Sequence, residues 1–327
     1  MELTFVAGTG RCGSTLLSRI LARHPGVLSM SEFFGVLRLA GATGRSKIPA
    51  GDMTGADLWD LLSRPFPMLD AMVTAGLRTA EMTYPFGCGR FDPATGVPLI
   101  SHFTLPMLTG EPDELFAALA AEVPRWPRRP AAAQYQALFA HLAGRMGRTH
   151  HGRTVVVERS AASLTLIGAL HEQFPSARFV HLHRDGPDCS LSMSRNPMFR
   201  REVLGFRPPY DAAALMTHPI PVEVFGRRFW SPMICAGVTA LRRLDPSTWT
   251  ELRYEDLLRD PATALTRLAA FIGTTAPRNW LAEATAMIDP ARAATAKAEA
   301  ELDPAAFAAL RHACEPGARA LREETPP

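Results

Sequence analysis

The sequence predicts an α/β fold of three layers, in which helices cover both faces of a central parallel β-sheet and a helical insertion and lid are added. Two segments carry this prediction. An apolar run at 3–7 leads into a glycine-rich turn and then a helical pattern. A strand, helix, strand series over 154–183 has short connections, which is a βαβ unit and implies parallel strands. With 327 residues, 47% of them hydrophobic, the chain can build a large core.

The glycine-rich turn has the composition of an anion-binding loop. Gly8, Gly10 and Gly13 allow a tight turn that brings backbone N–H groups close to a ligand, and the next helix begins with unpaired N–H groups. Gly8 and Gly13 have Walker A spacing, so a P-loop-like fold is expected, but Ser14 stands where that motif requires lysine. A phosphate or sulfate therefore suits the loop better than a magnesium-bound nucleoside triphosphate. A glycine turn without a ligand is the alternative.

The side chains of the loop support an anion as its ligand. Arg11 lies two residues before the last glycine, and the hydroxyl pair Ser14 and Thr15 follows it. A phosphatase loop is excluded, because Cys12 is followed six residues later by Ser18 and not by arginine.

The second predicted strand brings a carboxylate to the same place. Pro25 and Gly26 end the first helix, and a short strand at 27–30 delivers Glu32 just beyond its end. Ligands of open α/β sheets bind beyond the carboxyl ends of the strands, so Glu32 is expected near the same crevice as Arg11. The alternative is a solvated glutamate at a helix start.

The βαβ unit predicts a second anion site. Its first strand, 154–157, ends in Glu158-Arg159-Ser160, and its second strand, 178–183, ends at Arg184. A turn at 185–187 and a helix from Asp188 place Ser192 in the second turn of that helix, where an arginine and a hydroxyl converge on an anion. A capped helix beside a surface arginine is the alternative.

The other segments surround this core. Residues 35–150 lack alternating strands and are expected to be a mostly helical insertion. Residues 195–229 hold five prolines with little periodicity, which predicts an irregular lid. A helix at 231–244, a strand at 249–253 and a helix at 262–272 follow. The alanine-rich tail is expected to be helical and broken at Pro290, Pro304 and Pro316, with Arg292 or Lys297 as candidates to close over a phosphate.

The run Gly10-Arg-Cys-Gly-Ser-Thr-Leu-Leu17 resembles the 5′-phosphosulfate loop of sulfotransferases that use 3′-phosphoadenosine 5′-phosphosulfate (PAPS). Arg184 and Ser192 resemble the pair that binds the 3′-phosphate in that family, and Leu252-Arg-Tyr-Glu-Asp resembles its segment after the last core strand. The resemblance implies one sulfotransferase domain over 1–327. Its parts are a core at about 1–34 and 151–275, an insertion at about 35–150, a lid at about 196–229 and a C-terminal helical segment at about 277–327.

This resemblance implies that PAPS is the donor, that 3′-phosphoadenosine 5′-phosphate (PAP) is the product, and that no metal takes part. The residues it implies for the cofactor are Gly10, Arg11, Cys12, Gly13, Ser14, Thr15, Leu16, Arg184, Ser192 and Tyr254. The catalytic residues it implies are Glu32, Arg11 and Arg159. Many members carry a histidine base after the third strand, where this chain has Arg159-Ser160-Ala161. Tyrosylprotein and several bacterial members use a glutamate at the place of Glu32, which is therefore the expected general base.

The composition limits the partners. A formal charge of +3 gives no reason to expect nucleic acid binding, and no apolar run reaches the roughly 20 residues of a membrane span. The five cysteines are scattered outside any metal-ligand spacing, which favours reduced thiols in a cytoplasmic enzyme. We expect a small-molecule acceptor, apolar or lipid-like, and leave a homodimer open. The alternatives are a P-loop-type small-molecule kinase and an adenine-nucleotide-binding protein without catalysis.

Overall fold

The centre of the molecule is a sheet of parallel strands in the order β2-β6-β1-β7-β8. The computed structural model describes residues 1–40, 48–150, 153–289 and 296–324. The strands are β1 (Glu2–Ala7), β2 (Val27–Ser31), β6 (Arg153–Ser160), β7 (Arg178–His183) and β8 (Trp249–Arg253), with a short β5 (Thr149–His150) antiparallel to β6. The predicted parallel sheet is confirmed.

Alternating side chains give the sheet two apolar faces. Phe5 of β1 belongs to one buried cluster, whereas its neighbour Val6 belongs to the other. Val156 and Val157 of β6 divide in the same way. Because successive side chains of a strand point to opposite faces, this continuous apolar sequence requires helices on both sides.

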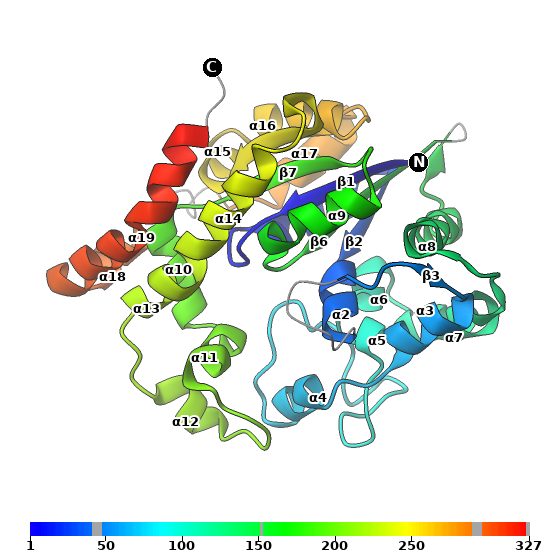
Figure 1. Cartoon of the computed structure of the whole chain (residues 1–327), viewed down its shortest axis with the longest axis horizontal. Helices are drawn as coiled ribbons and strands as arrows, with labels where there is room; N and C mark the ends of the chain where they lie inside the picture. The colour runs from blue at the N-terminus through cyan, green and yellow to red at the C-terminus, as the bar shows by residue number, and fades with distance from the viewer. Residues whose placement is uncertain (41–47, 151–152, 290–295, 325–327) are drawn as a thin grey trace.

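Helices from distant parts of the chain cover these faces. Helices α9 and α14 lie on one face, and α16 and α17 (Arg278–Ala286) lie beyond the other (Figure 1). The helices of the core are α1 (Ser14–Ala22), η2 (Ser163–Leu166), α9 (Ile167–Gln173), α10 (Gly186–Ser194), α14 (Ser231–Leu241), η4 (Pro246–Thr248), α15 (Tyr254–Arg259) and α16 (Pro261–Phe271). The three-layer prediction is therefore confirmed.

The strand register brings the predicted site residues to one edge of the sheet. Ser31, the last residue of β2, lies opposite Arg159, and Ala7, the last residue of β1, lies opposite Ser160 and His181. The segments that follow β2, β6, β1 and β7 consequently start side by side at the carboxyl edge.

The described part of the segment 35–150 is mostly helical, as predicted, and packs against β2 and β6 through α2 and α8. A two-residue ladder of β3 (Asp52–Met53) with β4 (Arg129–Pro130) is its own small sheet. The helices are α2 (Phe33–Ala40), α3 (Gly55–Ser63), α4 (Pro67–Thr74), α5 (Leu99–Phe103), α6 (Leu105–Leu108), α7 (Pro112–Glu122), η1 (Val123–Arg125) and α8 (Ala131–Arg145).

The expectation of an irregular stretch at 195–229 is wrong, because the structure forms helices there. Pro197 opens α11 at its first turn, where the missing N–H costs nothing, and the side chains of Asn196 and Asp211 cap α11 and α12. Pro197 thus starts a helix instead of preventing one. The elements are α11 (Pro197–Leu204), α12 (Ala212–Thr217), α13 (Glu223–Phe225) and a π-helical turn (Gly226–Trp230).

The C-terminal segment corrects a second expectation. Pro316 lies inside α19 (Pro304–Glu324) and does not end it. The helix packs along α14 and α10, and this tertiary contact holds it together where one backbone hydrogen bond is lost. The preceding helices are α17 (Arg278–Ala286) and α18 (Lys297–Glu301). Arg292 and Pro290 lie outside the described residues.

We predict that Phe5→Ala lowers the free energy of unfolding by about 3–5 kcal/mol, since the ring is fully buried and its removal leaves a cavity. The ring centroid of Phe5 lies 5.5 Å from that of Phe34, 5.6 Å from Phe174 and 5.5 Å from Phe179. Urea unfolding measures the loss. Phe307→Ala, at a half-buried position of α19, is the control, and an equal loss there would contradict this assignment of the core.

Candidate functional site

The glycine-rich loop joins β1 to α1 in a conformation that only a few residues adopt readily. Gly10, Arg11 and Gly13 have φ angles of 75°, 60° and 94°, in the left-handed region. Leu17 donates the first backbone hydrogen bond of α1, to the carbonyl of Gly13 at 3.1 Å. The amides that precede it, up to Leu16, have no partner within the helix, which makes this end an anion site.

Tyr254 explains why residue 13 is glycine. A Cβ atom there would lie 2.2 Å from Cδ2 of Tyr254, so the ring covers the loop directly. Tyr254 opens α15 after β8, and the guanidinium of Arg184 lies 5.2 Å from the centre of its ring. The ring thus joins the loop to the end of β7.

Cys12 supports the loop from below. Its side chain is fully buried, and a Cβ atom on Gly8 would lie 2.6 Å from its sulfur. Burial raises the pKa of the Cys12 thiol, so the thiolate that a nucleophile needs is disfavoured. The Cys12 side chain therefore packs under the loop and is not a candidate nucleophile.

The two predicted anion sites are in contact. Nε of Arg11 donates a hydrogen bond to Oγ of Ser192 at 3.2 Å, across 181 residues of sequence. Arg184 lies at the start of the same segment and contacts Oδ2 of Asp188 through Nη2 at 3.4 Å. Lys297, the remaining tail candidate, is exposed at the start of α18, next to Ala298, whose N–H donates to Asp188.

Glu32 and Arg159 form a buried ion pair between the ends of β2 and β6. Nη1 of Arg159 donates to Oε1 of Glu32, and Nε of Arg159 donates to Oγ of Ser18 at 3.0 Å. The N–H of Ala161 donates to Oε2 of Glu32 at 2.9 Å. Burial raises the pKa of Glu32, and the charge of Arg159 opposes that rise.

The backbone at Glu32 is strained, with φ of 59° on a residue other than glycine. Such a conformation persists only where neighbours enforce it, and it occurs often at functional sites. Here the N–H of Glu32 donates to the carbonyl of Arg159 at 2.6 Å, and its own carbonyl accepts from Val36 at 2.8 Å. Both ends of the residue are thereby fixed.

Glu158 is a second buried carboxyl, behind the pair. It accepts hydrogen bonds from Oγ of Ser160 at 2.6 Å and from the N–H of Phe34 at 3.2 Å. Ser160 in turn accepts from the N–H of Gly35 at 2.8 Å. These hydrogen bonds tie β6 to the start of α2. Burial raises the pKa of Glu158 to about 7, and the charge of Glu32 adds to the rise.

Glu81 is the residue of the site that sequence reasoning missed. Its Oε1 accepts a hydrogen bond from Oγ1 of Thr15 at 2.8 Å and lies 3.7 Å from Nη1 of Arg11. Burial works against its ionisation, yet the Thr15 hydroxyl and the charges of Arg159 and Arg11 outweigh burial and hold the pKa of Glu81 below its ordinary value. It comes from a turn at 78–84 without periodicity, so no local pattern marks it.

These residues surround one cavity of about 180 Å³. Its charged and polar wall contains Arg11, Ser14, Glu32, Glu81 and Arg159. Its other wall is largely apolar and comes from the insertion and the segment after α10: Val36, Leu39, Phe103, Met198 and Phe199. The cavity can therefore hold an anion at the loop and a partly apolar molecule beside it.

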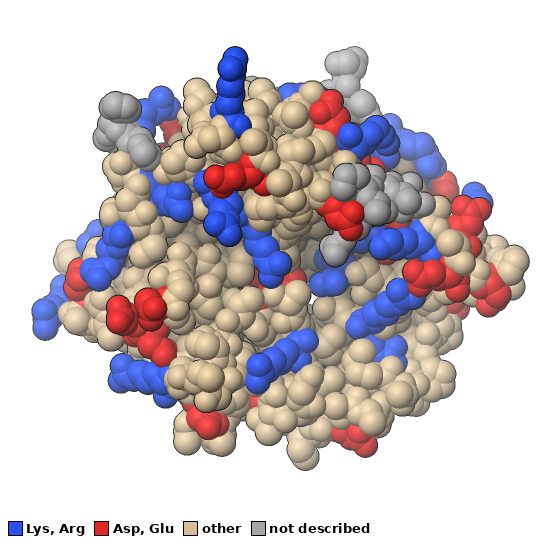
Figure 2. Space-filling model, turned by 180° about the vertical axis from the view of Figure 1, so that it is seen from behind, with Lys and Arg blue, Asp and Glu red and all other residues tan. Residues whose placement is uncertain are grey.

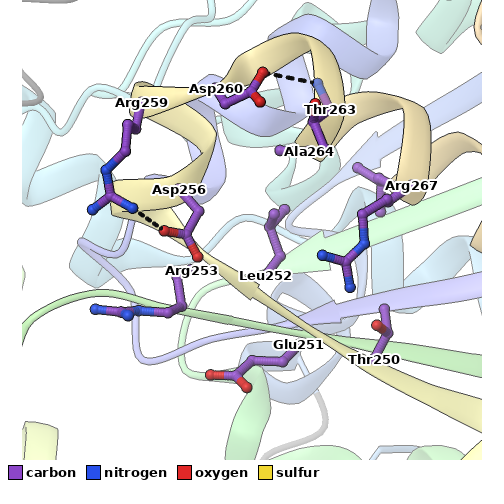
Figure 3. A pocket seen from close by; sticks show the side chains of 11 residues that line it. Thr250, Glu251, Leu252, Arg253, Asp256, Arg259, Asp260, Thr263, Ala264 and Arg267 are labelled. Atoms are coloured by element: carbon purple, nitrogen blue, oxygen red, sulfur yellow. Dashed lines mark hydrogen bonds and ion pairs between the residues drawn. The ribbon is translucent and has the colours of Figure 1, made fainter.

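A larger cavity of about 330 Å³ lies elsewhere, under the edge strand β8 (Figure 3). Arg259 pairs there with Asp256 at 2.9 Å, and Asp260 caps α16 by accepting from the N–H of Thr263 at 3.1 Å. Much of the charge in this second cavity is thus already paired, and the cavity shares no residue with the candidate site.

On the face drawn in Figure 2, several Lys and Arg side chains surround a hollow near the centre.

The family model described as "Sulfotransferase family" matches residues 107–278, which is more than half of the chain. A sulfotransferase domain from the Synechococcus PCC 7002 olefin synthase is 20% identical, with a TM-score of 0.50, and the match covers 97% of this chain and 94% of that one. The sulfotransferase domain from the curacin biosynthetic pathway is 16% identical (TM-score 0.46; 85% and 76% covered). A mouse sulfotransferase complexed with PAP is 10% identical (TM-score 0.43; 98% and 88% covered).

No curated protein matches this chain. The likeness to solved structures concerns the fold. In the described ranges, no helix has both the length and the apolar character needed to cross a membrane.

The raised pKa of Glu158 predicts a pH dependence of stability. Its carboxyl keeps a proton up to about pH 7 in the folded chain but only to about pH 4.5 in the unfolded chain, so raising the pH across this window destabilises the fold. Glu158→Gln keeps the accepting oxygen and cannot ionise. We expect the stability of the variant relative to wild type, measured as the difference in free energy of unfolding, to be larger at pH 8 than at pH 5 by on the order of 2 kcal/mol.

Urea unfolding at the two pH values measures this difference. Glu114→Gln, at an exposed position in the first turn of α7, is the matched control and should show no such difference. A variant-minus-wild-type difference that is the same at pH 5 and pH 8 for Glu158→Gln would contradict the assignment.

Proposed function

This chain belongs to the sulfotransferase family and depends on PAPS, and we propose that it transfers the sulfuryl group to a hydroxyl or amine of a small molecule by in-line displacement. The observation that carries the proposal is the hydrogen bond between Arg11 and Ser192. It joins an anion loop to a second candidate anion site, and a donor with separate 5′ and 3′ anionic groups needs such a pair. The family assignment favours this over a small-molecule kinase, for which Ser14 lacks the lysine.

The residues at the carboxyl edge fit such a donor. The loop already holds an anionic group, because the carboxylate of Glu81 accepts from Thr15 and faces Arg11. The amides of Gly13 to Leu16 with the hydroxyls of Ser14 and Thr15 would hold the 5′-phosphosulfate. Arg184 and Ser192 would hold the 3′-phosphate, and Tyr254, beside Arg184, would cover the nucleotide.

The chemistry follows from what these side chains can do. When bound, PAPS supplies a sulfuryl group whose bridging oxygen leaves with PAP. Arg11 would neutralise the charge that appears on this oxygen, and Arg159 would do so at the sulfuryl oxygens. Glu32 would accept the proton that the acceptor hydroxyl loses as its oxygen bonds to sulfur.

Glu32 can serve as this base although it is paired. Each carboxylate oxygen has more than one acceptor direction, so bonds from Arg159 and Ala161 leave room for the acceptor. Burial raises its pKa toward the range in which a carboxylate accepts protons more readily, and Arg159 keeps the ionised form available.

The apolar wall of the cavity supports an acceptor that is apolar or lipid-like. Phe103 comes from the insertion, and Met198 and Phe199 come from α11, so both segments would shape the acceptor site. Mass spectrometry of candidate alcohols, phenols and amines incubated with PAPS tests the function directly. Gain of one SO₃ group by an acceptor supports it, and absence of transfer to any acceptor together with absence of PAP binding would overturn it.

Replacing Glu32 with glutamine should lower turnover by roughly 10²–10⁴-fold, the usual contribution of a general base. Glutamine keeps an oxygen for Arg159 but cannot take a proton. Turnover with the acceptor found by the screen measures the loss, and calorimetry should show that PAP affinity stays within a few fold. Turnover within tenfold of wild type would mean that another group is the base.

Replacing Arg184 with alanine should weaken PAP binding by roughly 10- to 100-fold, as expected for the loss of a charge-assisted hydrogen bond to phosphate. Arg195→Ala is the matched control. Arg184 precedes α10, whereas Arg195 follows its last residue and pairs with Glu301 at the surface. Calorimetric titration with PAP measures both. Equal affinities for the two variants would remove Arg184 from the cofactor site.

A further inference from the structure

Glu81 occupies the place where the loop should hold the transferred group. Its carboxylate binds Thr15 and faces Arg11, and these are two of the side chains that the proposed function gives to the phosphosulfate. The contact spans 66 residues of sequence and is the point where the turn at 78–84 reaches the loop. The side chain is 17% exposed, so most of it lies inside the cavity wall.

A carboxylate and a phosphosulfate cannot share these donors. Thr15 has a single hydroxyl proton, and two anionic groups at one site repel each other. Binding of the donor therefore requires the carboxylate to leave Thr15.

The carboxylate of Glu81 lies in the same cavity wall as Glu32 and Arg159. Glu81 interacts electrostatically with Glu32 and with Arg159, so the three charges lie around the same cavity. On leaving the loop, Glu81 remains on the side from which the acceptor must approach. There its oxygens can accept a hydrogen bond from an acceptor and repel one that is anionic.

Building on the proposed function, we propose that Glu81 is a positioning residue of the transfer site: it competes with the donor for Thr15 and Arg11 and, once displaced, faces the acceptor. Donor binding is then coupled to the preparation of the acceptor site. The cavity wall also contains Arg38 and Glu202. The two carboxylates Glu32 and Glu81 therefore favour a neutral hydroxyl or amine at the reacting end of the acceptor.

The test is the affinity of the chain for PAP without acceptor. Glu81→Gln removes the competing charge and should bind PAP more tightly than wild type, by roughly tenfold, because PAP no longer has to displace a carboxylate from Thr15 and Arg11. Glu81→Ala is a second variant with the same expected direction. Glu202→Gln removes another carboxylate from the same cavity wall and should change the affinity far less, because the hydrogen bond of Thr15 goes to Glu81.

The direction of the change separates this role from a structural one. A side chain that only anchors the insertion would, when replaced, leave PAP affinity unchanged or weaken it, and either result for both Glu81 variants overturns the proposal. A gain as large for Glu202→Gln would also overturn it, because general charge would then be the cause. If the wild-type chain and every variant fail to bind PAP, the proposed function fails and this inference fails with it.

With an acceptor in hand, the Michaelis constants give a second reading. Glu81→Gln should raise the KM for the acceptor several-fold while lowering the KM for PAPS. A change of kcat alone, with both KM values unaltered, would contradict a role in placing either substrate.

Discussion

The buried ion pair of Glu32 with Arg159 is the interaction on which the site depends. Two opposite charges that are nearly removed from water stabilise little in total, yet removing one of them leaves the other unpaired at a cost of about 3–5 kcal/mol. The pair therefore holds the ends of β2 and β6 in one arrangement. The strained φ of Glu32 and the hydrogen bond from Ala161 are consequences of that arrangement.

Around this pair, the carboxyl edge gathers groups that complement an anion. The loop after β1 presents the first amides of α1 and Arg11, the segment after β7 presents Arg184 and Ser192, and Tyr254 covers the loop from the end of β8. Because the strands are parallel, their carboxyl ends lie at one edge of the sheet, and side chains that are far apart in sequence become neighbours there. The same geometry lets Glu81, from outside the core, reach the loop.

The positive charges of the cavity are therefore largely paired with carboxylates, which the loop sequence alone does not indicate. Arginines at positions 11 and 159 attract an anion, while the carboxylates of Glu32 and Glu81 occupy those arginines in the chain without ligand. Any ligand that enters exchanges one set of charge contacts for another. The side chains that would bind the donor thus already contact one another.

Local sequence determined the core elements, because strand periodicity, glycine spacing and helix stops act over a few residues. The strands at 178–183 and 249–253 and the loop at 8–13 follow from such signals. It did not determine the helices after Asn196, where Pro197 acts as a helix start, nor the unbroken α19, which depends on packing against α14. Only the tertiary structure decided that Arg11 meets Ser192, that Arg159 is bound to Glu32, and that Glu81 enters the loop. Those contacts span from 66 to 181 residues, and the register of the sheet, which no local pattern encodes, brings most of them together.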